Sequence, residues 1–266
     1  MASEIHPSAI VDPSAEIEPG TCIGPYCVIG KGVRIGAGTM LHAHVIIEQN
    51  TRLGRNCQVH PGAVLGGPPQ DYKYQGETTY VEIGDNNILR EFVTVHRATG
   101  EGSATRLGND NLLMAYAHVG HNCSIGNHVT MASYTGVSGH VSVEDYANFG
   151  GHVGVHQYAR VGTLAMIGGM SGVGKDIPPY MIAAGLPASV YDVNVRGLRR
   201  AGIPQKVRNE LRQAYKLLYR SNLNISQALE AIDEDIERSP ELEHLIAFIR
   251  DSRDGFAGRG NNPQPA

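Results

Sequence analysis

Histidines gathered on one short stretch are the residues of this 266-residue sequence best suited to chemistry. The stretch AYAHVGHNCSIGNHV, residues 115–129, places His118 and His121 three residues apart among apolar and glycine residues. Histidine has an unperturbed pKa of about 6.5, so a neutral imidazole can take a proton from a hydroxyl and return it to a leaving group. These residues favour acid–base chemistry on a hydroxyl, which needs no serine or cysteine nucleophile.

The elements that must hold these histidines follow a six-residue repeat. Every sixth residue from Ile5 to Val173 is apolar at 26 of 29 positions, and only Asp71, Glu77 and Glu101 break the series. A unit this short, with one aliphatic and one small residue pointing inward, predicts a strand followed by a corner. Such units pack only by coiling into a parallel β-solenoid whose turns lie about 4.8 Å apart.

The repeat also predicts the domain organisation. The solenoid is expected to span residues 1–186, with loops at 66–80 and 97–105 where the repeat is interrupted. From 187 to 254 the apolar residues follow helical spacing, and Ser239 with Pro240 marks the start of one helix, which predicts a small helical C-terminal domain. Residues 255–266 have the composition of a disordered tail.

Composition excludes several classes of function. The formal net charge of −4, without basic tracts among aromatic residues, excludes nucleic acid as a partner. No apolar stretch is long enough to span a membrane, and the N-terminus has no leader pattern, so we expect a cytoplasmic protein. The four cysteines lack metal-site spacing and are expected to be reduced thiols.

With three units per turn, residues 18 apart stack in columns, which predicts a cluster around His121. Gly139 lies one turn from His121 and Gln157 lies two turns away. The other members of this edge, within about 10 Å along the axis, are His118, His140 and His156. A base beside a glycine whose backbone N–H can approach a ligand is the minimum that acyl transfer requires.

A zinc site is one alternative interpretation of the same histidines. Three imidazoles on one edge would resemble the metal site of solenoid-type carbonic anhydrases, with ligands from adjacent subunits. The spacing of His118 and His121 on an extended corner suits that site poorly, and we expect no metal. A purely structural solenoid is compatible with the repeat but leaves the histidine cluster and the two loops unexplained.

The repeat resembles that of the hexapeptide-repeat acyltransferases, which implies an all-β, left-handed parallel β-helix shaped as a triangular prism and followed here by a small α-helical C-terminal domain. Across nearly the whole chain, longer motifs resemble the family of UDP-N-acetylglucosamine acyltransferases of lipid A biosynthesis. These motifs are GGPPQDYKYQGE, DNLLMAYAHVGHNCSIGN, SGHVSVEDYANFGG, VHQYARVG, GGMSGVGKDIPPY, VNVRGLRRAG and LRQAYKLLYRS.

The resemblance implies an enzyme that moves a (3-hydroxy)acyl chain from an acyl carrier protein thioester to the 3-hydroxyl of UDP-N-acetylglucosamine, the first step of lipid A synthesis. It implies a homotrimer that needs no cofactor besides the thioester co-substrate. His121 corresponds to the general base and Gly139 to the oxyanion donor. The remaining correspondences are Asp71, Lys73 and His118 as substrate contacts, His140 near the acyl chain, His156, Gln157, Asn194 and Arg200 at the UDP-sugar, and Gly169 with Met170 at the acyl-length position.

Two features stand apart from that resemblance. Asn122 follows the base where the family often has an acidic residue, while Arg196 and Ala201 replace an expected acid and an expected base.

Basic residues at the start of the helical segment are expected to dock an acidic carrier protein, through an interaction that salt weakens; these are Arg196, Arg199, Arg200, Lys206 and Arg208. An acetyl-CoA-dependent O-acetyltransferase, which would share the fold, remains the other enzymatic alternative.

Overall fold

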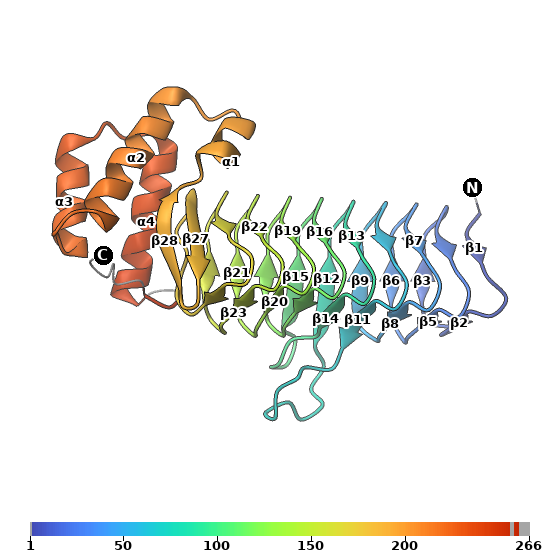
Figure 1. Ribbon diagram of the computed structural model, residues 1–266. Coiled ribbons are helices and arrows are strands. Elements are labelled where there is room, and N and C mark those ends of the chain that lie inside the picture. Colours follow the sequence, from blue (N-terminus) through green and yellow to red (C-terminus); the bar gives the residue numbers. More distant parts are fainter. Residues whose placement is uncertain (1, 256–257, 261–266) are drawn as a thin grey trace.

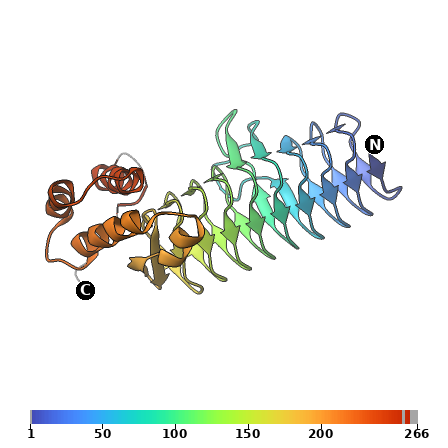
Figure 2. The same ribbon diagram turned by 90° about the horizontal axis from the view of Figure 1, so that it is seen from above.

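The computed structural model describes residues 2–255 and 258–260, and most of that chain is a coil of very short parallel strands. Each turn adds one strand to each of three sheets, so the coil is a three-sided prism (Figures 1 and 2). We call the sheets face 1, face 2 and face 3 in chain order. Face 1 comprises β1(Glu4–Ile5), β4(Cys22–Ile23), β7(Met40–Leu41), β10(Gln58–Val59), β13(Ile88–Leu89), β16(Leu112–Leu113), β19(Thr130–Met131), β22(Asn148–Phe149), β25(Met166–Ile167), β27(Met181–Gly185) and β28(Ala188–Val193).

The other two faces are built in the same way. Face 2 comprises β2(Ile10–Val11), β5(Val28–Ile29), β8(Ile46–Ile47), β11(Val64–Gly67), β14(Thr94–His96), β17(His118–Val119), β20(Gly136–Val137), β23(Gly154–Val155) and β26(Gly172–Val173). Face 3 comprises β3(Glu16–Ile17), β6(Arg34–Ile35), β9(Thr51–Leu53), β12(Tyr80–Ile83), β15(Ala104–Leu107), β18(Ser124–Ile125), β21(Ser142–Val143) and β24(Arg160–Val161).

The aliphatic and small residues of the repeat fill the inside of the prism, as the sequence predicts. Ile23, Leu41 and Val59, stacked on face 1, are each at most 1% exposed. Three of the four cysteines serve as small inward side chains, since Cys27, Cys57 and Cys123 are buried free thiols. Apolar burial along the axis and hydrogen bonds between turns therefore stabilise the coil together.

Strand register shows why the six-residue count continues through both loops. From β17 to β26 the parallel partners are 18 residues apart, as in His118 with Gly136. Across the first loop Val64 pairs with Thr94, 30 residues later, and across the second Thr94 pairs with His118, 24 residues later. Both insertions are multiples of six, so each side chain keeps its inward or outward orientation.

Two predicted boundaries need correction. The excursions from the coil cover residues 68–79 and 97–103, not 66–80 and 97–105, because β11, β12 and β15 extend over four residues at these turns. The strands also continue past residue 186: β27 pairs in parallel with β25, and β28 then pairs antiparallel with β27. Residues 188–193, predicted to begin the helical domain, are therefore strand.

Four helices follow: α1(Val195–Arg200), α2(Gln205–Tyr219), α3(Ile225–Asp235) and α4(Pro240–Asp254). They sit at the C-terminal end of the coil (Figure 1). Ser239 caps α4 by accepting a hydrogen bond from Leu242 N, and Pro240 begins the helix, as predicted. Their apolar sides form a second core that includes Leu211, Leu229 and Leu245.

A buried polar junction fixes α4 to the coil. The Arg160 guanidinium lies over the Phe248 ring, 3.9 Å from its centroid, and donates to Phe248 O and Ser252 Oγ, each at 2.7 Å. Arg160 Nε also donates to Asp176 Oδ2 at 3.3 Å. These contacts hold the helices in one position relative to the prism.

Within the described residues, no helix is both long and apolar enough to cross a membrane. The predicted disordered tail, 255–266, falls mostly outside the described part of the chain.

Candidate active site

The predicted cluster lies along the edge between face 2 and face 3. We call this the catalytic edge; it consists of the turns that carry His121, Gly139, His140, His156 and Gln157. His140 N donates to His121 O at 2.9 Å, which stacks these turns directly. The structure therefore brings the predicted histidines and Gly139 together, as the column count requires.

Asn122 and the second loop hold the His121 ring. Thr99 of that loop donates to Asn122 Oδ1 from both its backbone N, at 2.9 Å, and its hydroxyl, at 3.0 Å, while Asn122 Nδ2 donates to Thr99 O at 3.0 Å. A backbone N–H can only donate, so the amide atom that faces it is the oxygen. His121 Nδ1 lies 2.9 Å from that same oxygen and must carry the proton. In the neutral imidazole the lone pair is then on Nε2.

The Nε2 atom of His121 faces the next turn and the first loop. A Cβ added to Gly139 would lie only 2.4 Å from Nε2, so no other residue type fits there without moving the ring. Asp71 Oδ2 lies 3.9 Å from Nε2, too far for a hydrogen bond. Among the described residues Nε2 has no hydrogen-bond partner, so it is available to accept a proton from a substrate. The backbone N–H of Gly139 likewise has no partner within the described chain.

His118 is placed as a neutral imidazole. Its Nδ1 is 2.8 Å from the Thr94 hydroxyl, and its ring meets that of His96 edge-on, with the centroids 5.2 Å apart. Burial, together with the nearby imidazoles of His96 and His121, lowers the pKa of His118 to about 4. At neutral pH His118 therefore contributes hydrogen bonding without charge.

His140 lies on the catalytic edge, between the rings of His121 and Tyr158. Its ring stacks on Tyr158 with centroids 4.6 Å apart and meets the His121 ring nearly at right angles, with centroids 5.2 Å apart. Burial, His121 and Lys73 lower the pKa of His140, against the opposing effect of Asp71. The charges of both predicted loop residues, Asp71 and Lys73, therefore act on this imidazole in opposite directions.

His156 and Gln157 are exposed two turns farther along the edge. His156 Nδ1 donates to Gln157 O at 3.0 Å, and its Nε2 makes no hydrogen bond to another described residue. Both side chains are free to contact a ligand that extends along the axis.

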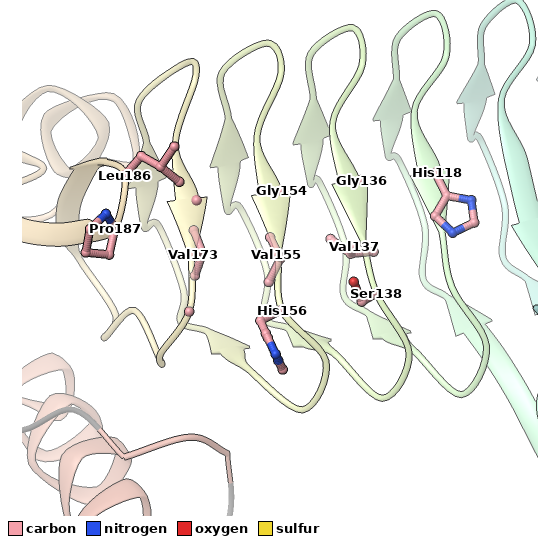
Figure 3. Close-up of a pocket in the computed structure, with 12 residues that line it drawn as sticks. His118, Gly136, Val137, Ser138, Gly154, Val155, His156, Val173, Leu186 and Pro187 are labelled. Carbon is pink, nitrogen blue, oxygen red and sulfur yellow. The ribbon is translucent and has the colours of Figure 1, made fainter. Parts of the chain in front are cut away.

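An apolar groove of about 640 Å³ runs along face 2 from His118 toward the hairpin of β27 and β28 (Figure 3). Glycines from three successive turns form its floor: Gly136, Gly154 and Gly172. A Cβ at Gly136 or Gly154 would meet nothing within 4 Å, so the space above the floor is open. Leu186 covers the far end. Gly169 and Met170 lie outside this groove, and their predicted effect on acyl length stays a prediction.

A second pocket, of about 760 Å³, lies between the outer side of face 1 and the start of the helices. It holds Asn194 and Arg200, the two residues of the helical end that the resemblance assigns to a UDP-sugar, beside the apolar side chains of Met166 and Val195. The Asn194 side chain also caps α1: it accepts from Gly197 N at 2.9 Å and donates to Leu164 O at 2.7 Å. Four arginines line the pocket without any ion pair to a described residue, namely Arg196, Arg199, Arg200 and Arg212.

The basic group predicted to dock a carrier protein is thus revised. Lys206 pairs with Glu237 at 2.6 Å, and Arg208 donates to Ile203 O and Gln205 Oε1, so both are already occupied. Arg212, which the sequence analysis missed, joins the unpaired arginines. Arg212 lies on α2, more than ten residues after the other three. In the sequence it is only one of several polar positions on an amphipathic helix, so nothing singles it out.

The sequence analysis also missed Thr99 and Thr94, which position the two central histidines. Thr94 occupies an outward position of the repeat and Thr99 lies in the second loop, so neither stands out in the repeat, and no spacing rule connects Thr99 to Asn122. Within the described residues, no group of three or more His, Cys, Asp or Glu side chains is arranged to hold a metal ion.

Comparisons with known proteins agree with this arrangement. Residues 32–67 and 104–139 match the bacterial transferase hexapeptide repeat, and residues 176–257 match domain 2 of UDP-N-acetylglucosamine O-acyltransferase. The acyl-[acyl-carrier-protein]–UDP-N-acetylglucosamine O-acyltransferase of Thermodesulfovibrio yellowstonii is 47% identical over 96% of this chain and 99% of its own length. That of Gloeothece citriformis is 44% identical over 82% and 79%.

Solved structures are similar over nearly the whole length. LpxA from Acinetobacter baumannii superimposes with a TM-score of 0.90 at 42% identity, covering 96% of this chain and 98% of that one. The UDP-N-acetylglucosamine acyltransferase of Francisella novicida gives a TM-score of 0.92 at 39% identity, covering 98% and 94%.

The fold and the histidine edge define a hexapeptide-repeat transferase: a left-handed parallel β-helix with a small helical C-terminal end, as the resemblance implies. Identity of 42–47% over most of the chain makes the assignment more specific. The chain belongs to the UDP-N-acetylglucosamine O-acyltransferase family.

We predict a defined response of the pH profile to changes at Asn122. Asn122→Ala removes the acceptor at Nδ1 and should lower kcat about 10- to 100-fold, because the ring loses its orientation. Asn122→Asp keeps an acceptor but adds a negative charge, which favours the protonated imidazole, so the acid limb of kcat/KM should move about one pH unit higher. Both effects are measured in pH–rate profiles of the purified variants. An Asn122→Ala profile identical to that of the wild type would contradict the role of Asn122.

Proposed function

We propose that the protein transfers an acyl chain from an acyl carrier protein thioester to the 3-hydroxyl of UDP-N-acetylglucosamine, with His121 as general base. The single observation that carries this proposal is the His121 ring itself. Its Nδ1–H is held by Asn122, its Nε2 is open, and the Cα of Gly139 lies against it one turn away. The family relatives carry the name of this activity over nearly the full chain. No cofactor is needed for the proposed transfer.

The chemistry follows from that geometry. Nε2 of neutral His121 takes the proton of the sugar 3-hydroxyl as its oxygen attacks the thioester carbonyl carbon. The backbone N–H of Gly139 donates to the carbonyl oxygen as negative charge develops there. The C–S bond then breaks, and the His121 imidazolium returns its proton to the departing thiolate, so the imidazole ends neutral. Asn122 and Thr99 keep the reactive nitrogen in place throughout.

The groove on face 2 supplies a place for the acyl chain. It begins at His118 beside the catalytic edge, is floored by glycines, and is walled by apolar side chains such as Leu186. Burial of each methylene contributes about 0.8 kcal/mol, so an apolar groove parallel to the axis favours a hydrocarbon chain over water.

The surface supports assembly into a homotrimer. Faces 1 and 2 expose apolar side chains, with Met40 43% and Ile10 67% exposed, whereas face 3 carries ion pairs such as Arg34 with Glu16. Two different apolar faces on one molecule fit a heterologous contact, in which face 2 of one copy packs on face 1 of the next. A closed ring of three copies joined by this contact would leave face 3 in solvent.

This packing joins the two halves of the site. Within one copy, His121 is on the edge of face 2, while the arginine pocket opens on face 1. Face-to-face packing brings the catalytic edge of one copy toward the arginine pocket of its neighbour. Arg200 of one copy would then hold the diphosphate, on a helix that Asn194 caps, while His121 of the next acts on the sugar.

The other unpaired arginines at this pocket are suited to an acidic carrier protein. Arg196, Arg199 and Arg212 have no acidic partner in the described chain, so an incoming carboxylate replaces only water. Such docking is expected to weaken as salt is added. Because such a transfer uses a nucleotide sugar and a carrier protein, we propose that the enzyme acts in the cytoplasm.

The proposed function is tested by donor choice. Purified protein is incubated with radiolabelled UDP-N-acetylglucosamine and a series of acyl carrier protein thioesters, and separately with the matching coenzyme A thioesters. Product from the carrier thioesters, decreasing with added salt, is the expected result. Efficient transfer of acetyl from coenzyme A, with none from the carrier protein, would favour the O-acetyltransferase alternative and contradict the proposal.

A further inference from the structure

We infer that His96 and Arg97 are positioning residues that clamp the 68–79 loop, and with it Asp71 and Lys73, over the catalytic edge. This inference rests on the proposed function for its activity readout. The two residues end β14 and begin the second loop, so they stand between the coil and both excursions. In Figure 1 the excursions project from the coil near β11 and β14.

The carbonyls at the start of the first loop accept hydrogen bonds from residues outside that loop. Pro68 and Pro69 have no backbone N–H, and the carbonyls just before them must find partners where the ladder ends. Three consecutive carbonyls are each taken by residues 96–97. Arg97 Nη1 donates to Gly66 O at 2.5 Å, Arg97 N donates to Gly67 O at 2.9 Å, and His96 Nδ1 donates to Pro68 O at 2.6 Å.

Arg97 reaches farther into the loop with the other arm of its guanidinium. Its Nη2 is 3.5 Å from the Tyr74 hydroxyl, which in turn donates to Glu77 O at 3.1 Å. The residue is only 5% exposed, no carboxylate of the described chain pairs with it, and its Nε is buried without a partner. Burying an unpaired guanidinium is costly. The planar guanidinium nevertheless connects the two sides of the loop, because one arm bonds to Gly66 and the other to Tyr74.

The far end of the same loop is fixed by a different set of contacts. Gly102 N donates to Thr78 O at 2.8 Å, and Gly100 N donates to Glu77 Oε1 at 2.9 Å. The outer part is braced only locally: Asp71 accepts from Lys73 N through Oδ1 at 3.0 Å. The position of Asp71 opposite His121 therefore depends on both ends, and His96 with Arg97 hold the end nearer to Asp71.

Substitutions at His96 distinguish the effect of its hydrogen-bond donor from the effect of its size. The Nδ2 of asparagine is bonded to Cγ, as is the Nδ1 of histidine, so His96→Asn keeps a donor at the right reach for Pro68 O. His96→Gln places its donor one bond farther, and His96→Ala has none. Arg97→Lys supplies a single ammonium that cannot reach both Gly66 O and the Tyr74 hydroxyl. Arg106→Met is the matched control, since Arg106 follows the second loop but faces solvent and pairs with Glu82.

Two measurements on the intact protein report on the clamp. One is the rate of tryptic cleavage after Lys73, identified by fragment mass, which needs no substrate. The other is the split between KM for UDP-N-acetylglucosamine and kcat. His96→Ala, His96→Gln and Arg97→Lys should raise the cleavage rate about 10-fold, because the loop opens more often. They should also raise KM about 10-fold, because the loop side chains lose their fixed geometry.

His96→Asn and Arg106→Met should behave as the wild type in both measurements. Thermal unfolding of each variant is measured to check that the coil remains folded. Cleavage of His96→Ala at the wild-type rate, or a His96→Asn variant as impaired as His96→Ala, would overturn the inference. A wild-type protein with a protected Lys73 site but no transfer from any carrier thioester would overturn the proposed function and leave the clamp standing.

Discussion

Replacing His121 with alanine should reduce acyl transfer about 100- to 10,000-fold, the range that a positioned general base contributes. The structure gives the reason: Nε2 of this ring is oriented by the opposite nitrogen, has no hydrogen-bond partner among the described residues, and lies against Gly139 one turn away. The half-buried His118, whose pKa is lowered to about 4, is neutral, but its Nδ1 is hydrogen-bonded to Thr94 and it pairs with Gly136, not with Gly139. It cannot replace His121 without moving.

His128→Ala is the matched control for that variant. His128 is an outward imidazole on a different edge of the prism, stacked on Tyr146 with centroids 4.6 Å apart. Its loss should leave kcat/KM unchanged. Steady-state rates and unfolding temperatures are measured for both variants. Neither substitution should change the unfolding temperature by much. A His121→Ala enzyme with a tenth or more of wild-type activity would remove His121 as the base.

Gly139→Ala should be nearly as damaging, with kcat falling about 100- to 1000-fold. The added methyl group would lie 2.4 Å from Nε2 and 2.6 Å from Cε1 of His121, so either the ring or the turn must shift. Either movement separates the base from the backbone N–H that we assign to the oxyanion. The loss should therefore appear in kcat more than in KM.

Loss of stability must be separated from loss of chemistry in this variant. Gly54→Ala creates a collision of the same size, 2.4 Å from Gly84 O, at a turn away from the catalytic edge. Both variants should unfold at lower temperature, but only Gly139→Ala should lose activity per folded enzyme. Equal losses of activity in the two would show that Gly139 acts through stability alone.

The sequence predicts the fold so well because the repeat is governed by local packing. An inward aliphatic residue at every sixth position is needed wherever a turn stacks, and only Asp71, Glu77 and Glu101 interrupt the series, all within the two excursions. The insertions preserve the phase, so the column that connects His121 to Gly139 is correct. The end of the coil was placed too early because β28 runs antiparallel and follows no six-residue pattern.

The site could be predicted only as far as the columns extend. Asn122 is adjacent to His121 in sequence, but its function depends on Thr99, which a loop brings in from 23 residues away. Asn194 was expected at the nucleotide, and the structure shows in addition that it caps α1. Arg212 reaches its pocket through the packing of α2 on β28. Contacts made by loops and by the helical end have no period, so the sequence pattern does not contain them.

Mixed assemblies test the central claim most directly, because the proposed site combines His121 of one copy with Arg200 of the next. His121→Ala and Arg200→Ala are each expected to be inactive when pure. Unfolded together and refolded as mixed trimers, they place an intact His121 opposite an intact Arg200 at about one interface in four. The account predicts that transfer from carrier thioester to UDP-N-acetylglucosamine recovers to about a quarter of the wild-type rate. No recovery in correctly assembled mixed trimers would contradict it.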